Sequence, residues 1–178
     1  MKTEYIKLSR HIVSKIGLTC YSIVHTTEED LSVYNIDDSS YSHLYSILNT
    51  NVFLIKFEII NLLPIPLETL CTHLKNKIMF LQFPYDFTID AISSYLLSIR
   101  SAFLLSGEAV LLPYHDSEFL NKFIPLCNPE QLISFMGPIN EIILEDIEKG
   151  FVSYSKENNL LKCTILSDVM SLEKINKV

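Results

Sequence analysis

His115 and Asp116 are the neighbouring residues best suited by type to acid–base chemistry, because a carboxylate can orient an imidazole that takes up a proton. Adjacent side chains of an extended chain point to opposite sides, however, which places these two groups badly for a hydrogen-bonded dyad. Asp116 also precedes a run with helical character, Ser117 to Phe123, and is a good N-cap for it. We therefore predict no catalytic residue. A small enzyme that uses His115 with a distant carboxylate or with Cys127 is a less favoured alternative.

The residue types that hold metals and phosphates are scattered along the chain. Histidines and cysteines stand far apart, at His11, His25, His43, His73 and His115 and at Cys20, Cys71, Cys127 and Cys163. No CxxC or HExxH spacing is present, and the four glycines are isolated, so neither a zinc motif nor a phosphate-binding loop can be built. The sequence thus predicts no metal site, no cofactor and no disulfide framework. The cysteines are expected to be small buried apolar residues in a reducing compartment.

The composition favours a globular chain with an acidic surface. Of the 178 residues 48% are apolar, enough to bury a core, and the formal net charge is −7. Nucleic-acid binders concentrate Lys and Arg on one face, so we expect no nucleic-acid partner. The N-terminal segment MKTEYIKLSRHIVSKIG mixes charged and apolar positions, unlike a secretion signal, and the apolar run IINLLPIPL is too short to cross a bilayer. We expect a cytoplasmic protein with no membrane partner.

Apolar periodicity predicts alternating helices and strands in the first half of the chain. The first helix is expected to end near Gly17 and to carry Ile6, Leu8, Ile12 and Ile16 on one face. Further predicted elements are a strand at 18–24, a helical turn at 28–31, strands at 43–48 and 52–60 divided by a polar turn at 49–51, a helix at 64–77, a strand at 78–83 and a helix at 88–101.

Turn and cap residues organise the second half of the chain. A hairpin is expected over 102–115 with its turn at Gly107, and Pro113 makes its second strand an edge candidate. Asn128, Pro129 and Gln131 predict a capped helix that ends at Gly137. A strand with a solvated acidic stretch at 141–148, a hairpin over 151–166 and a frayed tail at 171–178 follow.

These elements predict an α/β or α+β fold, with a mixed sheet, helices packed on it and a C-terminal part of helices and a hairpin. The length favours a single domain covering residues 1–178. A division into an N-terminal lobe at 1–87 and a second lobe at 88–178 stays open.

Residues 95–143 follow a distinctive order: a helix ending in LLSIRS, the hairpin AFLLSGEAVLLPYHD, the helix SEFLNKFIPL, and then CNPEQLISFMGPINEI. This order resembles the conserved core of the type VI secretion effector chaperones, also called adaptor proteins. In that family a helix with a leucine-arginine ending leads into a hairpin and an FRFYDP signature. A leucine-rich helix and a Pro-Glu-Gln helix closed by Phe-Gly-Pro then follow.

The matching positions include most of the closing motif. Arg100 matches the helix-ending arginine, and Tyr114 and Asp116 fall on the signature. The closing motif is matched by Asn128, Pro129, Glu130, Gln131, Phe135, Gly137 and Pro138. Upstream, CYSIVHTT and VFLIKFE resemble two of the family's strands. Among the departures from the signature, Pro113, His115 and Ser117 replace an arginine, an aromatic residue and a proline.

The resemblance implies a non-catalytic chaperone that holds a secreted effector in the cytoplasm, through the effector's N-terminal region, and helps to load it onto the secretion spike. The spike protein is a further expected partner. The partner-binding residues expected on this basis are Arg100, Leu112, Tyr114, His115, Asp116 and Phe135, and the predicted edge strand at 111–114 is one docking place, by strand addition. The main alternative is an immunity protein that blocks a toxin, which the negative charge would suit if the toxin were basic.

Overall fold

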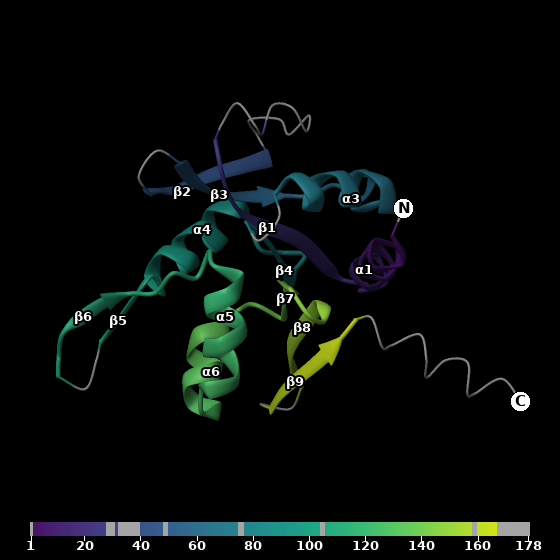
Figure 1. The fold of residues 1–178 in the computed structure, drawn as a ribbon. Helices are drawn as coiled ribbons and strands as arrows, with labels where there is room; N and C mark the ends of the chain where they lie inside the picture. The colour runs from purple at the N-terminus through teal and green to yellow at the C-terminus, as the bar shows by residue number, and fades with distance from the viewer. Residues whose placement is uncertain are drawn as a thin grey trace, which may run out of the picture.

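The structure is a computed structural model that describes residues 2–27, 31, 40–47, 50–74, 77–103, 106–157 and 160–166. Seven strands form one sheet in the order β2–β3–β1–β4–β7–β8–β9, and each adjacent pair is antiparallel (Figure 1). The strands are β1 (Leu18–Thr26), β2 (Tyr41–Ile47), β3 (Thr50–Lys56), β4 (Ile78–Pro84), β7 (Glu141–Asp146), β8 (Gly150–Glu157) and β9 (Leu160–Ile165). An antiparallel sheet with helices packed on it is an α+β fold, which is one of the two classes predicted from the sequence.

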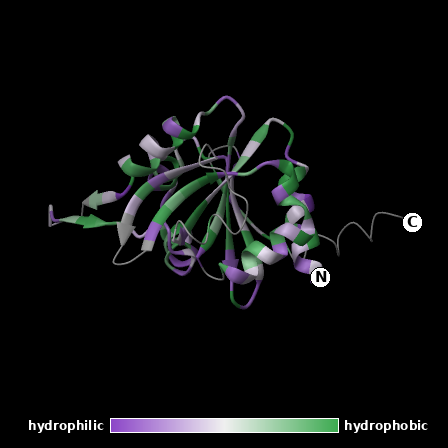
Figure 2. Ribbon diagram, turned by 90° about the horizontal axis from the view of Figure 1, so that it is seen from above, coloured by the Kyte–Doolittle hydropathy of each residue, from purple (hydrophilic) through white to green (hydrophobic). Residues whose placement is uncertain are grey.

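Helices cover both faces of the sheet (Figure 2). Helices α1 (Thr3–Val13) and α3 (Pro64–His73) pack on one face. Helices α4 (Ile89–Ser98), α5 (Ser117–Phe123) and α6 (Pro129–Met136) pack on the other. The central strands are therefore apolar on both sides, as β1 shows, where Tyr21 and Ile23 belong to one core and Cys20 and Val24 to the other.

The connection from β3 to β4 passes through the short 3₁₀ helix η2 (Ile59–Leu62) and α3. Both strands pair antiparallel with β1, from its two sides, so they run in the same direction with β1 between them. The strand, helix and strand predicted at 52–60, 64–77 and 78–83 thus form a crossover with β1 between its two strands. Strand β4 then pairs with β7, which joins the first and second halves of the chain in one sheet.

Local capping sets where the helices on the second face begin. Thr88 accepts a hydrogen bond from the backbone N–H of Ala91, and Asp116 accepts from those of Glu118 and Phe119 at 2.9 and 3.0 Å. Asn128 and Gln131 form a reciprocal capping box. The predicted caps at Asp116 and Asn128 are thus confirmed, and each is worth about 1 kcal/mol by its type.

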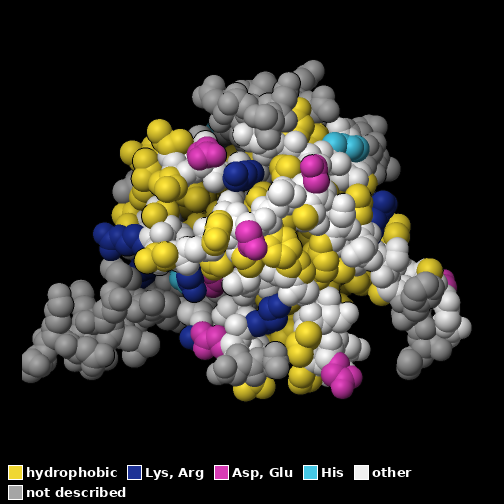
Figure 3. All heavy atoms as spheres, turned by 180° about the vertical axis from the view of Figure 1, so that it is seen from behind, with side chains coloured by type: hydrophobic (Ala, Val, Ile, Leu, Met, Phe, Trp, Pro, Cys, Tyr) yellow, Lys and Arg dark blue, Asp and Glu magenta, His cyan; other side chains and the backbone are white. Residues whose placement is uncertain are grey.

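A second, two-stranded sheet consists of β5 (Ser101–Phe103) and β6 (Ala109–Leu111). It extends away from the helices of its face (Figure 1) and lies at the lower right of the space-filling view in Figure 3. Gly107 in its turn has φ +83°, as the predicted turn requires. The 3₁₀ helix η3 (Ile124–Leu126) continues α5 and ends near Cys127.

Several sequence predictions differ from the structure. The strand predicted at 52–60 ends at Lys56, because the chain turns into η2 and leaves Ile59 and Ile60 exposed. The first helix ends at Val13 and buries Tyr5, Leu8 and Ile12, whereas Ile16 lies beyond its end. Cys163 is exposed on the edge strand β9 rather than buried.

The acidic stretch at 141–148 was predicted to be solvated, and Glu141 contradicts this because its residue is only 2% exposed. One oxygen of Glu141 lies 2.8 Å from His11 Nε2 and accepts a hydrogen bond from Ser153, while the other lies 3.8 Å from Lys15 Nζ. A buried carboxylate persists only when it is paired in this way. Glu141 therefore ties α1 to the centre of the sheet.

Other predictions fall on residues that the structure does not describe. These are most of the turn at 28–31, Asn49 of the turn at 49–51, Asn158 and Asn159 of the last hairpin, and the tail at 171–178. Among the described residues, no helix is long and apolar enough to cross a membrane.

Candidate functional site

Tyr45 on β2 is the centre of a cluster that gathers three of the predicted binding residues. The guanidinium carbon of Arg100, just after α4, lies 4.3 Å from the centroid of the Tyr45 ring. The Tyr45 hydroxyl lies 2.8 Å from His115 Nδ1, and the Tyr114 ring meets Tyr45 edge to face at 5.8 Å. Arg100, Tyr114 and His115 thus all contact Tyr45, which comes from a strand much earlier in the sequence.

His25, at the end of β1, completes the cluster. Its ring centroid lies 5.3 Å from that of His115. Burial lowers the pKa of His115, and His25 lowers it further. Burial also lowers the pKa of His25, together with the charge of Lys77. Both shifts favour the neutral imidazole, which suits the contact of His115 with the Tyr45 hydroxyl.

Three of the predicted residues have evident architectural roles. Tyr114 is only 1% exposed and belongs to the core between the sheet and the helices of its face. Asp116 caps α5, so its carboxylate is directed to the helix and away from His115. Phe135 is buried and meets Phe123 edge to face at 5.3 Å. Side chains of this kind shape a neighbouring surface through their packing.

An apolar groove lies between the β5–β6 hairpin and α6. It has a volume of about 780 Å³, and Leu112 and Phe135 line it together with Ser98, Ile99, Ser101, Ala102, Val110, Phe123, Leu126, Cys127, Glu130, Gln131 and Ser134. Leu126, at the end of η3, is 82% exposed, so a large apolar side chain stands in solvent at its border. Burying that side chain would gain about 2 kcal/mol. The groove is therefore a surface on which an apolar partner would be stabilised.

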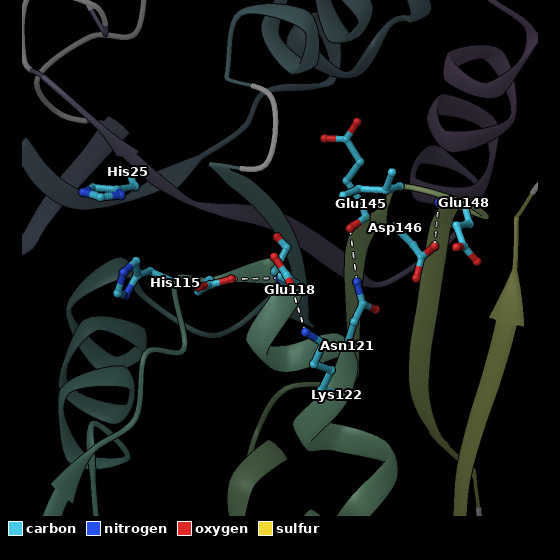
Figure 4. Close-up of a pocket in the computed structure, with 11 residues that line it drawn as sticks. His25, His115, Glu118, Asn121, Lys122, Glu145, Asp146 and Glu148 are labelled. Atoms are coloured by element: carbon cyan, nitrogen blue, oxygen red, sulfur yellow. Dashed lines mark hydrogen bonds and ion pairs between the residues drawn. The ribbon is translucent and has the colours of Figure 1, made fainter.

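A second cavity, of about 610 Å³, lies between α5 and the turn that joins β7 to β8. Its lining contains the five carboxylates of Asp116, Glu118, Glu145, Asp146 and Glu148, and one lysine, Lys122. Figure 4 shows His25 and His115 on one side of this cavity and the turn with Glu145 and Glu148 on the other, with α5 between them. We refer to it as the acidic pocket.

Hydrogen bonds engage much of the charge in the acidic pocket. Lys122 Nζ lies 2.7 Å from Glu118, one helical turn away on α5. Asp146 accepts from the backbone N–H groups of Glu148 and Lys149 and so closes the β7–β8 turn. Asn121 donates to the carbonyl of Glu145 at 3.1 Å, which fastens α5 to β7. These groups hold the pocket's own walls in place.

The residues of the enzyme alternative occupy different cavities. His115 lines the acidic pocket, whereas Cys127 lines the groove, where its thiol lies 3.5 Å from the carbonyl oxygen of Phe123. Burial raises the pKa of Cys127, which disfavours a reactive thiolate. Among the described residues, no three His, Cys, Asp or Glu side chains are grouped as they would be to hold a metal ion.

Sequence reasoning missed Tyr45, His25 and Leu126. Tyr45 and His25 come from strands about 70 and 90 positions before His115, and no local pattern signals their approach. The exposure of Leu126 could have been suspected from the sequence. Pro125 ends the predicted helix, so the apolar residue that follows it falls outside the helix's buried face.

Comparisons with protein-family models, curated proteins and solved structures found no match to this chain.

Proposed function

We propose that this chain is a chaperone and adaptor that binds a secreted type VI effector, through the effector's N-terminal region, and helps to load it onto the secretion spike. One observation carries the proposal. Every residue that lines the apolar groove lies between Ser98 and Phe135, within the segment 95–143 whose order resembles the effector chaperones. The segment that resembles the effector chaperones is thus also the segment that forms the apolar groove.

The groove has the composition expected of a protein-binding surface. Its lining includes the aromatic residues Phe123 and Phe135 and the exposed Leu126. Polar side chains such as Gln131 and Ser134 lie on the α6 side. An apolar centre with a polar rim is the usual anatomy of an interface between proteins. A partner with unshielded apolar segments, as an effector has before delivery, would be covered there.

Co-expression and pull-down test this function. The probe is the product of the neighbouring gene, which under this proposal is the toxic effector, and we expect it to co-purify with the wild-type chain. Ser134→Trp places a bulky ring in the groove and should weaken capture. Ile133→Trp is the matched control, because Ile133 is exposed on the same helix but does not line the groove. Failure of the wild-type chain to capture the toxin while both proteins are folded would remove the proposal.

The acidic pocket favours a second candidate function, an immunity protein. A cavity lined by five carboxylates and one lysine is complementary to a basic active site of a toxin, and such complementarity speeds association. An immunity protein should protect cells that express the toxin without any secretion apparatus. Protection by this chain alone, lost on Glu145→Lys and kept on Ser134→Trp, would favour the second function over the first.

A further inference from the structure

The β5–β6 hairpin has open edges, and its pairing shows which backbone groups face outwards. Leu112 N–H donates to the Arg100 carbonyl at 2.8 Å, and the register continues through Ala102 opposite Val110. Hydrogen-bonded and non-bonded pairs alternate in an antiparallel ladder. Arg100–Leu112 and Ala102–Val110 are therefore bonded pairs, and the N–H and C=O groups of Ser101 and Phe103 point away from β6. In the described part of the chain, β5 pairs with β6 alone.

The groove adjoins the free edge of β5 rather than that of β6. Ser101 and Ala102 of β5 line it, whereas Ala109 and Leu111, whose backbone groups face outwards from β6, do not. Leu111 is 65% exposed. Ala102, Val110 and Leu112 share one face of the hairpin, because they occupy alternate positions in register, and all three line the groove. The lining of the groove thus favours docking at 101–103 over docking at the expected edge, 111–114.

The opposite wall indicates what would fit beside β5. It consists of α6, η3 and the end of α5, with Phe123, Phe135 and Leu126 as apolar groups and Gln131 and Ser134 as polar ones. Glu130 is the one charged residue among the described residues that line the groove. An extended chain would direct alternate side chains towards this wall, so small or aliphatic residues fit there, and a lysine or arginine would be complementary to Glu130.

A second copy of this chain is a poor occupant of the same edge. Strand β5 has three residues and is therefore roughly 10 Å long. A stable dimer buries about 800 Å² on each partner, far more than two such edges would cover. A single extended segment needs only the edge and the groove beside it.

We propose that β5 binds an extended segment of the partner protein as a third strand, with alternate apolar side chains of that segment in the groove and a basic residue near Glu130. This inference rests on the proposed function and adds the mode of recognition. Backbone hydrogen bonds from Ser101 and Phe103 would provide affinity with little dependence on sequence, and the groove would select apolar side chains.

Proline substitutions test the two edges against each other. Phe103→Pro removes an outward N–H from β5, and Ala109→Pro removes the outward N–H of the directly opposite residue on β6. Phe103→Ala controls for the lost ring. With the purified product of the neighbouring gene as the probe, we expect Phe103→Pro to weaken binding about tenfold relative to Phe103→Ala, because a ladder hydrogen bond is lost and the proline ring blocks the new strand. Ala109→Pro should stay within about twofold of the wild-type chain.

Hydrogen exchange in the wild-type complex gives a readout that does not depend on the folding of the variants. The amides of Ser101 and Phe103 should exchange rapidly in the free chain and become protected on binding, while those of Ala109 and Leu111 stay unprotected. Equal effects of the two prolines, or no gain of protection at Ser101 and Phe103 in a formed complex, would overturn strand addition and leave the chaperone function intact. If no complex forms, both proposals fail.

Discussion

The apolar groove and the acidic pocket border the same face of the sheet but differ in what their side chains do for the fold. In the pocket, Asp116 caps α5, Asp146 closes a turn and Lys122 is paired with Glu118. At the groove, Leu126 stands largely in solvent and contributes little to the core. Charges in the pocket are explained by the architecture that they hold together. The exposed leucine lies beside an apolar groove, so a partner bound in the groove would bury it.

The largest expected effect comes from the α6 wall of the groove. Gly137 ends α6 with φ +44°, and a Cβ there would collide with the ring of Tyr95, whose hydroxyl donates to the Phe135 carbonyl at 2.6 Å. We expect Gly137→Ala to lower the free energy of unfolding by about 3 kcal/mol, through strain and overpacking together. Urea unfolding would measure it.

Gly107→Ala is the control for this substitution. Gly107 also has a positive φ but nothing within 4 Å of the added Cβ, so the cost should be about 1 kcal/mol from backbone strain alone. Equal costs at the two glycines would show that Tyr95 does not brace α6.

Glu141 tests how firmly the strand that supports the acidic pocket is held. It begins β7, whose other end carries the pocket residues Glu145 and Asp146. Burial alone would raise the pKa of Glu141, but the hydrogen bond and charge of His11, with Ser153 and Lys15, lower it below the ordinary value of 4.5. A carboxylate of this kind stabilises the fold above the unfolded pKa, and its contribution is lost as pH falls through the folded pKa.

We expect Glu141→Gln to lose about 2 kcal/mol of unfolding free energy at neutral pH, because it removes one partner of a buried pair. The loss should shrink as the pH falls from about 4.5 through the lowered folded pKa, because the unfolded wild-type chain takes up the proton first. Unfolding at several pH values would test this. Glu148→Gln, at an exposed position of the pocket rim, should change stability by less than about 0.5 kcal/mol. A pH-independent loss in Glu141→Gln would contradict the ion-pair explanation.

We expect a smaller pH dependence of the unfolding free energy from His115, which lines the acidic pocket. Its pKa is lowered from 6.5, mainly by burial, so the unfolded chain binds the proton more tightly. Its stabilisation is present above the unfolded pKa and is lost as pH falls through 6.5 towards the folded value. His115→Gln should reduce the drop in unfolding free energy between about pH 7 and pH 5 by less than about 1 kcal/mol, since the ring is partly solvated. An unchanged drop would show that His115 does not titrate in this window.

Much of the local structure could be predicted from the sequence, and the assembly of the site could not. Asp116, Asn128 and Gly107 specify caps and turns through neighbours within three residues, so a linear pattern contains the signal. Tyr45 and His25 reach His115 only because the sheet order places β2 and β1 beside the segment after β6. The burial of Glu141 has the same origin, since its partner His11 lies 130 positions away in the sequence.

Salt provides the smallest expected effect and separates the two surfaces directly. Glu130 is the one charge among the described lining residues of the groove, whereas carboxylates dominate the pocket. Partner affinity at the groove should change by less than about threefold between about 50 mM and 500 mM salt, because burial of apolar surface is not screened. Fluorescence anisotropy would follow it. A steep loss of affinity with salt would place the partner in the acidic pocket.

The proposal that the groove is the polypeptide-binding surface is tested most directly by the dissociation constants of two matched variants, measured by calorimetry with the product of the neighbouring gene as the candidate partner. Leu126, at the groove, and Ile147, at the acidic pocket, are 82% and 81% exposed, so glutamate at either position should leave the fold intact. We predict that Leu126→Glu weakens binding at least about tenfold and Ile147→Glu less than about twofold. Equal losses, or a larger loss at Ile147, would contradict the account.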